Sequence, residues 1–147
     1  FLARQPRPYA VYHPGAGRPE KAWGEERFAA LASLLEKSGR LAPVVSWGPG
    51  DEARVERMSE LFAPARPVPP LSLAGLARVV SGASLFVAGD TGPLHLADAL
   101  GVPTLALFGP TDPSRNGPYR NPGWTVRYDA ETGPEEVARK ALKVLAA

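Results

Sequence analysis

The feature that most constrains the fold is the alternation of short apolar runs with longer segments whose apolar residues recur at helical spacing. This alternation is typical of a parallel sheet, because parallel neighbours need a long crossover connection and that crossover is usually a helix. The apolar runs that predict strands cover 9–13, 43–47, 85–88, 104–108 and 124–128. The expected fold class is therefore α/β, a parallel sheet with helices on both faces.

Helices are expected between these strands, where apolar residues return every three or four positions. In chain order they cover 25–38, a segment capped by Asp51, a segment capped by Ser72, 93–100 and 135–145. Gly39 stands where a helix C-cap glycine belongs. The proline-rich stretch 64–70 predicts a turn region around one short strand, and 109–123 predicts a long loop of the kind that often carries function.

Composition excludes several classes of protein. A chain of 147 residues suits one domain, which we expect to cover 1–147, and its lack of cysteine excludes disulfides and thiolate metal sites. No cluster of metal ligands is visible, and a net charge of +2 is too weak to indicate nucleic-acid binding. No apolar run approaches the ~20 residues of a transmembrane segment. Scarce amide residues and a single methionine favour a thermophilic source.

The most informative motif is Gly89-Asp90-Thr91-Gly92-Pro93-Leu94-His95, between a buried strand and a helix. Backbone N–H groups at a helix N-terminus carry partial positive charge, so a phosphate can lie there, and Gly92 allows a ligand to approach the backbone closely. Asp90 can accept hydrogen bonds from sugar hydroxyls. The alternative is a turn in which Asp90 or Thr91 only caps the helix. His95 either packs against the Asp90 loop and fixes it, contacts the ligand or transfers a proton.

Three other polar loops follow strands. The loop 14–23 contains two glycines that expose backbone N–H groups, and its Lys21 brings a charge suited to phosphate or is merely solvated. The loop 47–52 carries Glu52, which can bind ribose hydroxyls or favour the helix N-terminus. The segment 108–113 can wall the same crevice or stiffen a connection. Because carboxyl ends of parallel strands share one edge of the sheet, all four loops predict one ligand site there.

Together these segments resemble the C-terminal half of glycosyltransferase family 9, the lipopolysaccharide heptosyltransferases. The resemblance spans nearly the whole chain and rests on His13-Pro14-Gly15-Ala16, Lys21-Ala22-Trp23, Trp47-Gly48 with Glu52, Leu71-Ser72-Leu73, Asp90-Thr91-Gly92 with His95, and Phe108-Gly109-Pro110-Thr111-Asp112-Pro113.

This resemblance implies a Rossmann-like sheet that forms one lobe of a GT-B enzyme, in which two lobes face each other across a cleft. The enzyme would be an inverting transferase that moves heptose from ADP-heptose to a lipopolysaccharide core acceptor, without a cofactor or metal. A missing N-terminal lobe would bind the acceptor and supply the base. We therefore assign no catalytic residue to this chain, expect 1–8 to be a linker, and expect the isolated lobe to be inactive. The implied location is cytoplasmic, including peripheral attachment at the inner face of the cytoplasmic membrane.

The donor-binding residues follow from the same resemblance. Lys21 would contact the diphosphate, Glu52 the ribose and Asp90 the sugar. Some members of the family carry threonines where this chain has alanine and glycine before the lysine, so backbone N–H groups must serve here. The full predicted set is Ala16, Gly17, Lys21, Glu52, Leu71, Asp90, Thr91, Gly92 and His95.

Three other functions compete with this interpretation. A nucleotide-sugar epimerase shares the two-lobe architecture but needs acid and base groups around the sugar, for which Asp90 and His95 are the few candidates. A non-catalytic nucleotide-sugar-binding module is the second alternative. A hydrolase triad of Ser72 or Ser84 with His95 and Asp90 is disfavoured, because neither serine lies in a Gly-x-Ser-x-Gly elbow.

Overall fold

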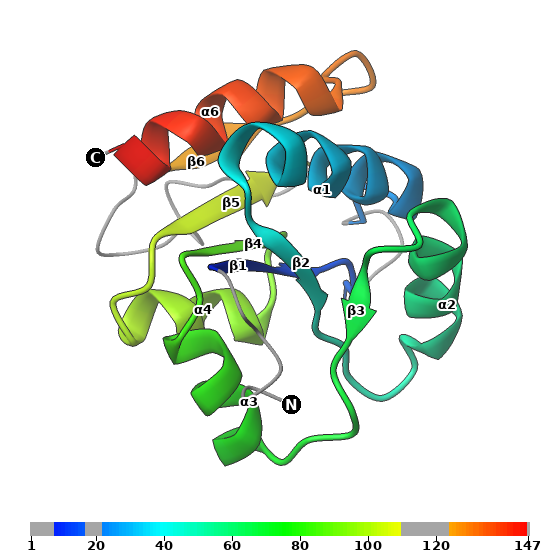
Figure 1. Ribbon diagram of the computed structural model, residues 1–147, viewed down its shortest axis with the longest axis vertical. Helices are drawn as coiled ribbons and strands as arrows, with labels where there is room; N and C mark the ends of the chain where they lie inside the picture. Colours follow the sequence, from blue (N-terminus) through cyan, green and yellow to red (C-terminus); the bar gives the residue numbers. More distant parts are fainter. Residues whose placement is uncertain (1–7, 17–21, 110–123, 147) are drawn as a thin grey trace.

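The computed structural model describes residues 8–16, 22–109 and 124–146. These residues form a six-stranded sheet with the order β3-β2-β1-β4-β5-β6 (Figure 1). The strands are β1 (Tyr9–His13), β2 (Ala42–Val45), β3 (Arg66–Pro67), β4 (Leu85–Ala88), β5 (Thr104–Phe108) and β6 (Thr125–Arg127). Every neighbouring pair of strands is parallel, which confirms the predicted α/β class.

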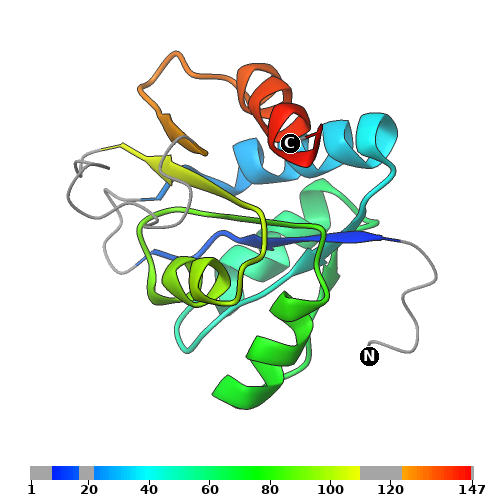
Figure 2. The same ribbon diagram turned by 90° about the vertical axis from the view of Figure 1, so that its left-hand side faces the viewer.

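Helices cover both faces of this sheet, as the alternating pattern predicts (Figure 2). The helices of the described residues are α1 (Glu25–Gly39), α2 (Glu52–Leu61), α3 (Leu73–Ser81), α4 (Gly92–Ala99) and α6 (Pro134–Ala146). One apolar cluster lies between the sheet and α1, α2 and α6, and a second lies between the sheet and α3 and α4. The chain therefore buries two apolar layers, and the sheet is the shared wall between them.

Strand β1 lies at the centre of the sheet and is buried along its whole length. Successive side chains of a strand point to opposite faces. Accordingly Ala10 and Tyr12 belong to the cluster under α1, whereas Tyr9 and Val11 belong to the cluster under α3 and α4. Burial on both faces explains why the sequence of this strand is apolar up to its last residue, which is His13.

Two helix N-termini are capped by the side chains expected from the sequence. Ser72 accepts a hydrogen bond from the backbone N–H of Gly75 at 3.1 Å, at the start of α3. Thr91 occupies the same position before α4 and accepts from the N–H of Leu94 at 3.4 Å. Of the two capping candidates before α4, Thr91 is thus the residue that caps the helix.

Two other helix-end predictions are wrong. Asp51 precedes α2, but its carboxylate makes no capping bond and instead accepts the backbone N–H of Gly48 at 3.0 Å. At the end of α1 the left-handed residue is Arg40, with φ of 54°, and Gly39 is still helical. At Asp51 a contact within the preceding loop replaces the cap, whereas at the end of α1 the helix extends one residue further than the glycine position indicates.

Some strand ends differ slightly from those that the sequence predicts. Strand β2 ends at Val45 rather than at residue 47, and the ladder closes with the N–H of Ser46 donating to the Tyr12 carbonyl at 2.9 Å. Trp47 already belongs to the next loop, where its indole N–H donates to the Val68 carbonyl at 2.8 Å. The short strand expected within 64–70 is β3. Most of the long loop predicted over 109–123 falls outside the described residues.

Candidate functional site

The strand order places a crevice between β1 and β4. From β1 the chain proceeds outward to β2 and β3, then returns to form β4 on the other side of β1. At such a reversal the loops that leave the two central strands diverge, and ligands of open α/β sheets bind in the gap. His13 at the end of β1 pairs with Ala88 at the end of β4, so the two loops begin side by side.

A cavity of about 370 Å³ occupies this crevice. It is lined by His13, Gly15, Ala16, Pro49, Asp51, Asp90, Thr91 and Gly92. Four of the predicted donor-binding residues therefore lie together at one edge of the sheet, and the loops after β1, β2 and β4 each contribute to the wall. Gly17 and Lys21, which the sequence also places in this site, lie outside the described residues.

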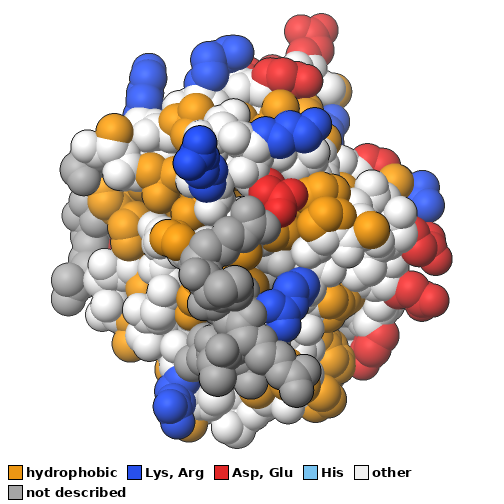
Figure 3. Space-filling view, in the orientation of Figure 1, with side chains coloured by type: hydrophobic (Ala, Val, Ile, Leu, Met, Phe, Trp, Pro, Cys, Tyr) orange, Lys and Arg blue, Asp and Glu red, His pale blue; other side chains and the backbone are white. Residues whose placement is uncertain are grey.

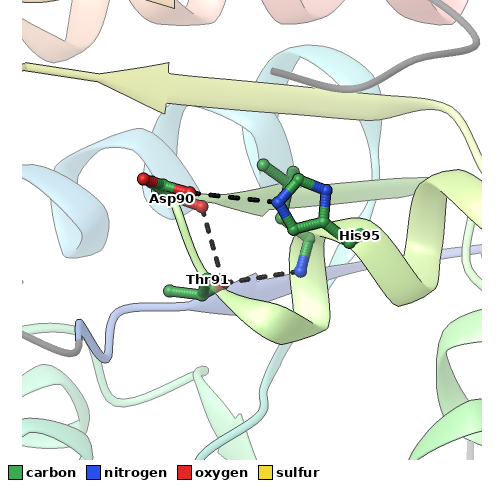
Figure 4. A network of polar contacts seen from close by, with 5 residues as sticks. Asp90, Thr91 and His95 are labelled. Atoms are coloured by element: carbon green, nitrogen blue, oxygen red, sulfur yellow. Dashed lines mark hydrogen bonds and ion pairs between the residues drawn. The ribbon is translucent and has the colours of Figure 1, made fainter. Parts of the chain in front are cut away.

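The start of α4 forms one wall of the cavity. Because the first N–H groups of a helix have no partner within the helix, the segment at Thr91 and Gly92 presents hydrogen-bond donors and partial positive charge. Figure 4 shows His95 lying over Asp90, one turn into the same helix. His95 Nε2 lies 3.9 Å from Asp90 Oδ1, and the two side chains are 40% and 14% exposed.

The position of His95 favours one of its three possible roles. It is not among the residues that line the cavity, and its contact is with the Asp90 carboxylate. From there it can orient Asp90, and when protonated it can also pair with it. The structure thus favours His95 as a residue that fixes the Asp90 loop, rather than as a direct ligand.

A second cavity of about 200 Å³ adjoins the first, and Pro49 lines both. Its walls are Trp47, Gly48, Pro49, Glu52, Pro70 and Leu71. The hydrogen bond from the Trp47 indole to the Val68 carbonyl fixes the aromatic wall against the loop that follows β3. A mostly apolar slot with one carboxylate fits a nucleoside, because a base can stack on the apolar walls while the ribose hydroxyls donate to Glu52. Leu71 and Glu52 are both predicted site residues.

Asp51 connects the two loops that flank the cavity. Its carboxylate accepts the Gly48 N–H and also lies directly against Gly15. A Cβ built on Gly15 would stand 2.7 Å from the Asp51 carboxyl carbon, closer than real Cβ contacts allow. A side chain at residue 15 would therefore force the Asp51 carboxylate or the β1 loop to move, a constraint that no local sequence pattern reveals.

His13 is a site residue that the sequence reasoning missed. Its side chain is only 6% exposed, it lines the larger cavity, and its Nδ1 lies 2.9 Å from Ser46 Oγ. Burial lowers the pKa of His13, and the nearby Asp51 carboxylate offsets part of this effect. The imidazole is therefore neutral near pH 7. The available signal was a polar residue that ends a buried strand immediately before Pro14-Gly15.

Another hollow, of about 680 Å³, lies at the opposite edge of the sheet. Its lining includes Pro8, Leu41, Ser84, Pro103 and Trp124, each of which precedes a strand. It therefore marks the amino ends of the strands, where ligands of open α/β sheets do not usually bind. The two smaller cavities, which bring together six of the nine predicted site residues, form the candidate site.

The model of glycosyltransferase family 9 (heptosyltransferase) matches residues 2–145 of the chain. The chain belongs to this family. Lipopolysaccharide heptosyltransferase 1 of Escherichia coli strain K12 is 42% identical over 112 residues, which cover 76% of this chain and 35% of that protein. The chain thus spans about a third of the length of this curated relative.

Solved structures of the family share the fold. The structure described as E. coli heptosyltransferase WaaC with ADP has a TM-score of 0.85 and 34% identity, covering 98% of this chain and 47% of that one. A WaaC structure with ADP-2-deoxy-2-fluoro heptose has a TM-score of 0.77 and 33% identity, covering 92% and 42%. These matches confirm the Rossmann-like sheet as one lobe of a GT-B architecture.

UDP-GlcNAc 2-epimerases match more weakly. The enzyme from Neisseria meningitidis has a TM-score of 0.69 at 14% identity, over 97% of this chain and 38% of that one. At that identity the likeness concerns the fold alone. It gives no support to the epimerase alternative, whereas the family model and the heptosyltransferases agree with each other.

Proposed function

We propose that this chain is the donor-binding lobe of an inverting glycosyltransferase that moves heptose from ADP-heptose to a lipopolysaccharide core acceptor. The observation that carries the proposal is the pair of adjoining cavities at the sheet reversal, one suited to a nucleoside and one to phosphates. Family membership supports it, as do the ADP and the ADP-heptose analogue named for the related WaaC structures.

We propose that each part of the donor contacts a different group of the residues that line the two cavities. The adenine would lie between Trp47 and Leu71, with the ribose hydroxyls on Glu52. The diphosphate would pass Pro49 and reach the N–H groups at the start of α4, and the heptose would meet Asp90. Lys21 is proposed as the cation on the diphosphate, from the sequence resemblance.

The proposed chemistry of this lobe is stabilisation of the leaving group. In an inverting transfer the acceptor hydroxyl attacks the anomeric carbon, and the bond from that carbon to the diphosphate breaks with both electrons remaining on ADP. Negative charge therefore grows on the phosphate oxygen next to the α4 N-terminus. Preorganised donors at such a position are worth about 2.7–4 kcal/mol each where one has been removed. Nothing in this step requires a metal.

A second lobe is part of the proposal. The chain spans 35% of the E. coli relative and 47% of the WaaC chain with ADP. We propose that 1–147 folds as one domain, that 1–8 is a linker, and that the acceptor and its base belong to the other lobe. The isolated chain should then bind ADP without transferring sugar.

Glu52→Gln tests the nucleoside slot. This change should weaken ADP binding about tenfold, because a hydrogen bond to a charged acceptor contributes about 1.5–3 kcal/mol. It should barely affect 2′,3′-dideoxy-ADP, which lacks the hydroxyls that Glu52 would bind. Calorimetry on both ligands gives the comparison, and Glu56→Gln on the exposed side of α2 is the matched control. An equal loss for both nucleotides would exclude Glu52 from ribose binding.

We propose that the lobe also attaches peripherally to the inner face of the cytoplasmic membrane. None of the described helices has the length and apolar character that crossing a membrane requires. Lys and Arg side chains gather over α6 at the top of Figure 3. Between β6 and α6 lies a groove of about 400 Å³ whose charged residues are Arg127, Glu136, Arg139, Lys140 and Lys143. Four cations against one carboxylate suit the anionic surface on which a lipid-linked acceptor would lie.

Reversing two of these charges tests the attachment. Lys140→Glu with Lys143→Glu should reduce co-sedimentation with phosphatidylglycerol vesicles more than tenfold, since each basic residue contributes about 1 kcal/mol at an anionic surface. ADP affinity should not change, because the groove lies at the far edge of the sheet from the two cavities. Lys37→Glu on α1 is the control. Vesicle binding that survives the double reversal would place any membrane contact elsewhere.

A further inference from the structure

His13 and Ser46 form a polar pair at the base of the larger cavity. Ser46 is completely buried and His13 is 94% buried, yet both carry polar groups at the carboxyl ends of adjacent strands. Their contact is the 2.9 Å approach of Ser46 Oγ to His13 Nδ1. Since buried polar groups are unfavourable unless they are hydrogen-bonded, this contact stabilises both side chains at their buried positions.

The serine decides which ring nitrogen carries the proton. A fully buried hydroxyl hydrogen needs an acceptor, and His13 Nδ1 lies within hydrogen-bond distance. If Nδ1 carried the proton, it would donate to Ser46 Oγ, and the hydroxyl hydrogen would need a second buried acceptor. A buried hydroxyl donor without an acceptor is strongly unfavourable. The favoured arrangement has Ser46 donating to a bare Nδ1, and the proton on Nε2.

That tautomer gives the cavity a neutral N–H donor. Nδ1 is engaged by Ser46, so Nε2 is the polar atom that His13 presents to the cavity it lines. Thr91 and Gly92 line the same cavity and offer helix N-terminal N–H groups. Two carboxylates also line the cavity: Asp51 accepts the Gly48 N–H, and Asp90 lies beside His95. An anion in this cavity would therefore be bound by the N–H groups of His13, Thr91 and Gly92.

We propose that His13 binds the donor diphosphate directly through a neutral Nε2–H, and that Ser46 is the positioning residue that fixes this tautomer. This rests on the proposed function, because it assumes that a nucleoside diphosphate occupies the cavity. It adds a residue from β1 to the phosphate contacts of the α4 loop. The ligand is then held from both central strands of the sheet, across the point where the strand order reverses.

The decisive measurement is the imidazole nitrogen spectrum of the uniformly ¹⁵N-labelled chain. The chain has only two histidines, so His13 and His95 can be assigned with one variant, His95→Gln. His13 should show a protonated Nε2 and an unprotonated Nδ1 at pH 7, and ADP but not adenosine should shift the Nε2 proton resonance. A protonated Nδ1, or an Nε2 proton resonance that ADP does not shift, overturns the proposal even if ADP binds.

Variants provide a second, independent readout. His13→Ala should weaken ADP binding about tenfold to a hundredfold, the loss expected for one hydrogen bond to a charged group, and should leave adenosine affinity unchanged. His13→Gln, whose amide reaches the Nε2 position, should restore part of the loss. Ser46→Ala should release Nδ1 and yield a mixture of tautomers in the nitrogen spectrum, with a smaller loss of ADP affinity.

Two outcomes separate this inference from the proposed function. If the unaltered chain binds ADP and His13→Ala loses ADP and adenosine equally, His13 is a packing residue and only the inference fails. If the unaltered chain binds neither ADP nor ADP-heptose, the proposed function itself fails. Should His13→Ala fail to fold, the nitrogen spectrum of the unaltered chain still decides, because it requires no substitution at this buried position.

Discussion

Gly15→Ala is expected to lower ADP affinity by at least about tenfold, equivalent to about 1.4 kcal/mol. The added Cβ would stand 2.7 Å from the Asp51 carboxyl carbon and 2.8 Å from its Oδ1, so one of the two must move. Asp51 has a short side chain held by the Gly48 N–H at 3.0 Å, and it cannot yield without losing that bond. The β1 loop should therefore shift, and it carries one wall of the phosphate cavity. Calorimetry with ADP measures the effect.

A second-site change distinguishes this local clash from general damage. Asp51→Ala removes the carboxylate, so Gly15→Ala in that background should cost much less affinity than in the original chain. Gly39→Ala is the control, because its Cβ would meet Leu41 Cγ at an ordinary 3.7 Å and residue 39 lines neither of the two cavities. Equal losses with and without Asp51 would show that the loop needs glycine for another reason. This double-mutant cycle isolates the contact between two loops that lie far apart in sequence.

Asp90→Asn is expected to lower the turnover number of sugar transfer about a hundredfold while changing ADP affinity less than about twofold. Its carboxylate lines the cavity beyond the α4 N-terminus, where the heptose would lie. A negative charge near the anomeric carbon stabilises positive charge that develops on the sugar ring only in the transition state. Turnover and catalytic efficiency should therefore fall together. The assay uses a two-lobe enzyme formed by joining this chain to an acceptor-binding lobe of the family.

The control for this experiment is Glu60→Gln, an exposed carboxylate on α2 whose loss should leave transfer unchanged. His95→Gln should give a smaller loss of turnover than Asp90→Asn, since His95 contacts Asp90 rather than the cavity. If Asp90→Asn abolished ADP binding and left turnover intact, Asp90 would be a structural residue of the loop. The assignment of the sugar to this end of the cavity would then be wrong.

The fold could be predicted from the sequence because its signals are local. The buried runs at 9–13, 85–88 and 104–108 match β1, β4 and β5, since a strand covered on both faces must be apolar throughout. The polar loops could be placed at one edge of the sheet because the carboxyl ends of parallel strands lie at the same edge. Two helix ends were misplaced because residue type alone suggested a cap: Asp51 bonds the Gly48 N–H instead, and α1 includes Gly39 and has Arg40 as its C-cap.

The rest of the site depends on contacts that no local pattern encodes. His13 and Ser46 are 33 positions apart, and they meet because β1 and β2 are neighbours in the sheet. Asp51 and Gly15 meet because the loops after the same two strands pack together. Asp51 was read as a cap because Asp is common before helices. The thermophilic source stays a prediction from composition.

The donor site at the sheet reversal is tested most directly by an ADP titration of the ¹⁵N-labelled chain, followed by backbone chemical shifts. We expect saturable shifts at the loops after β1, β2 and β4, including Gly15, Glu52 and Thr91, with weaker binding of UDP and GDP. Residues at the amino edge, such as Leu41 and Trp124, should not respond. Shifts confined to that edge, or no saturable shift with ADP, would contradict the placement of the donor at the sheet reversal.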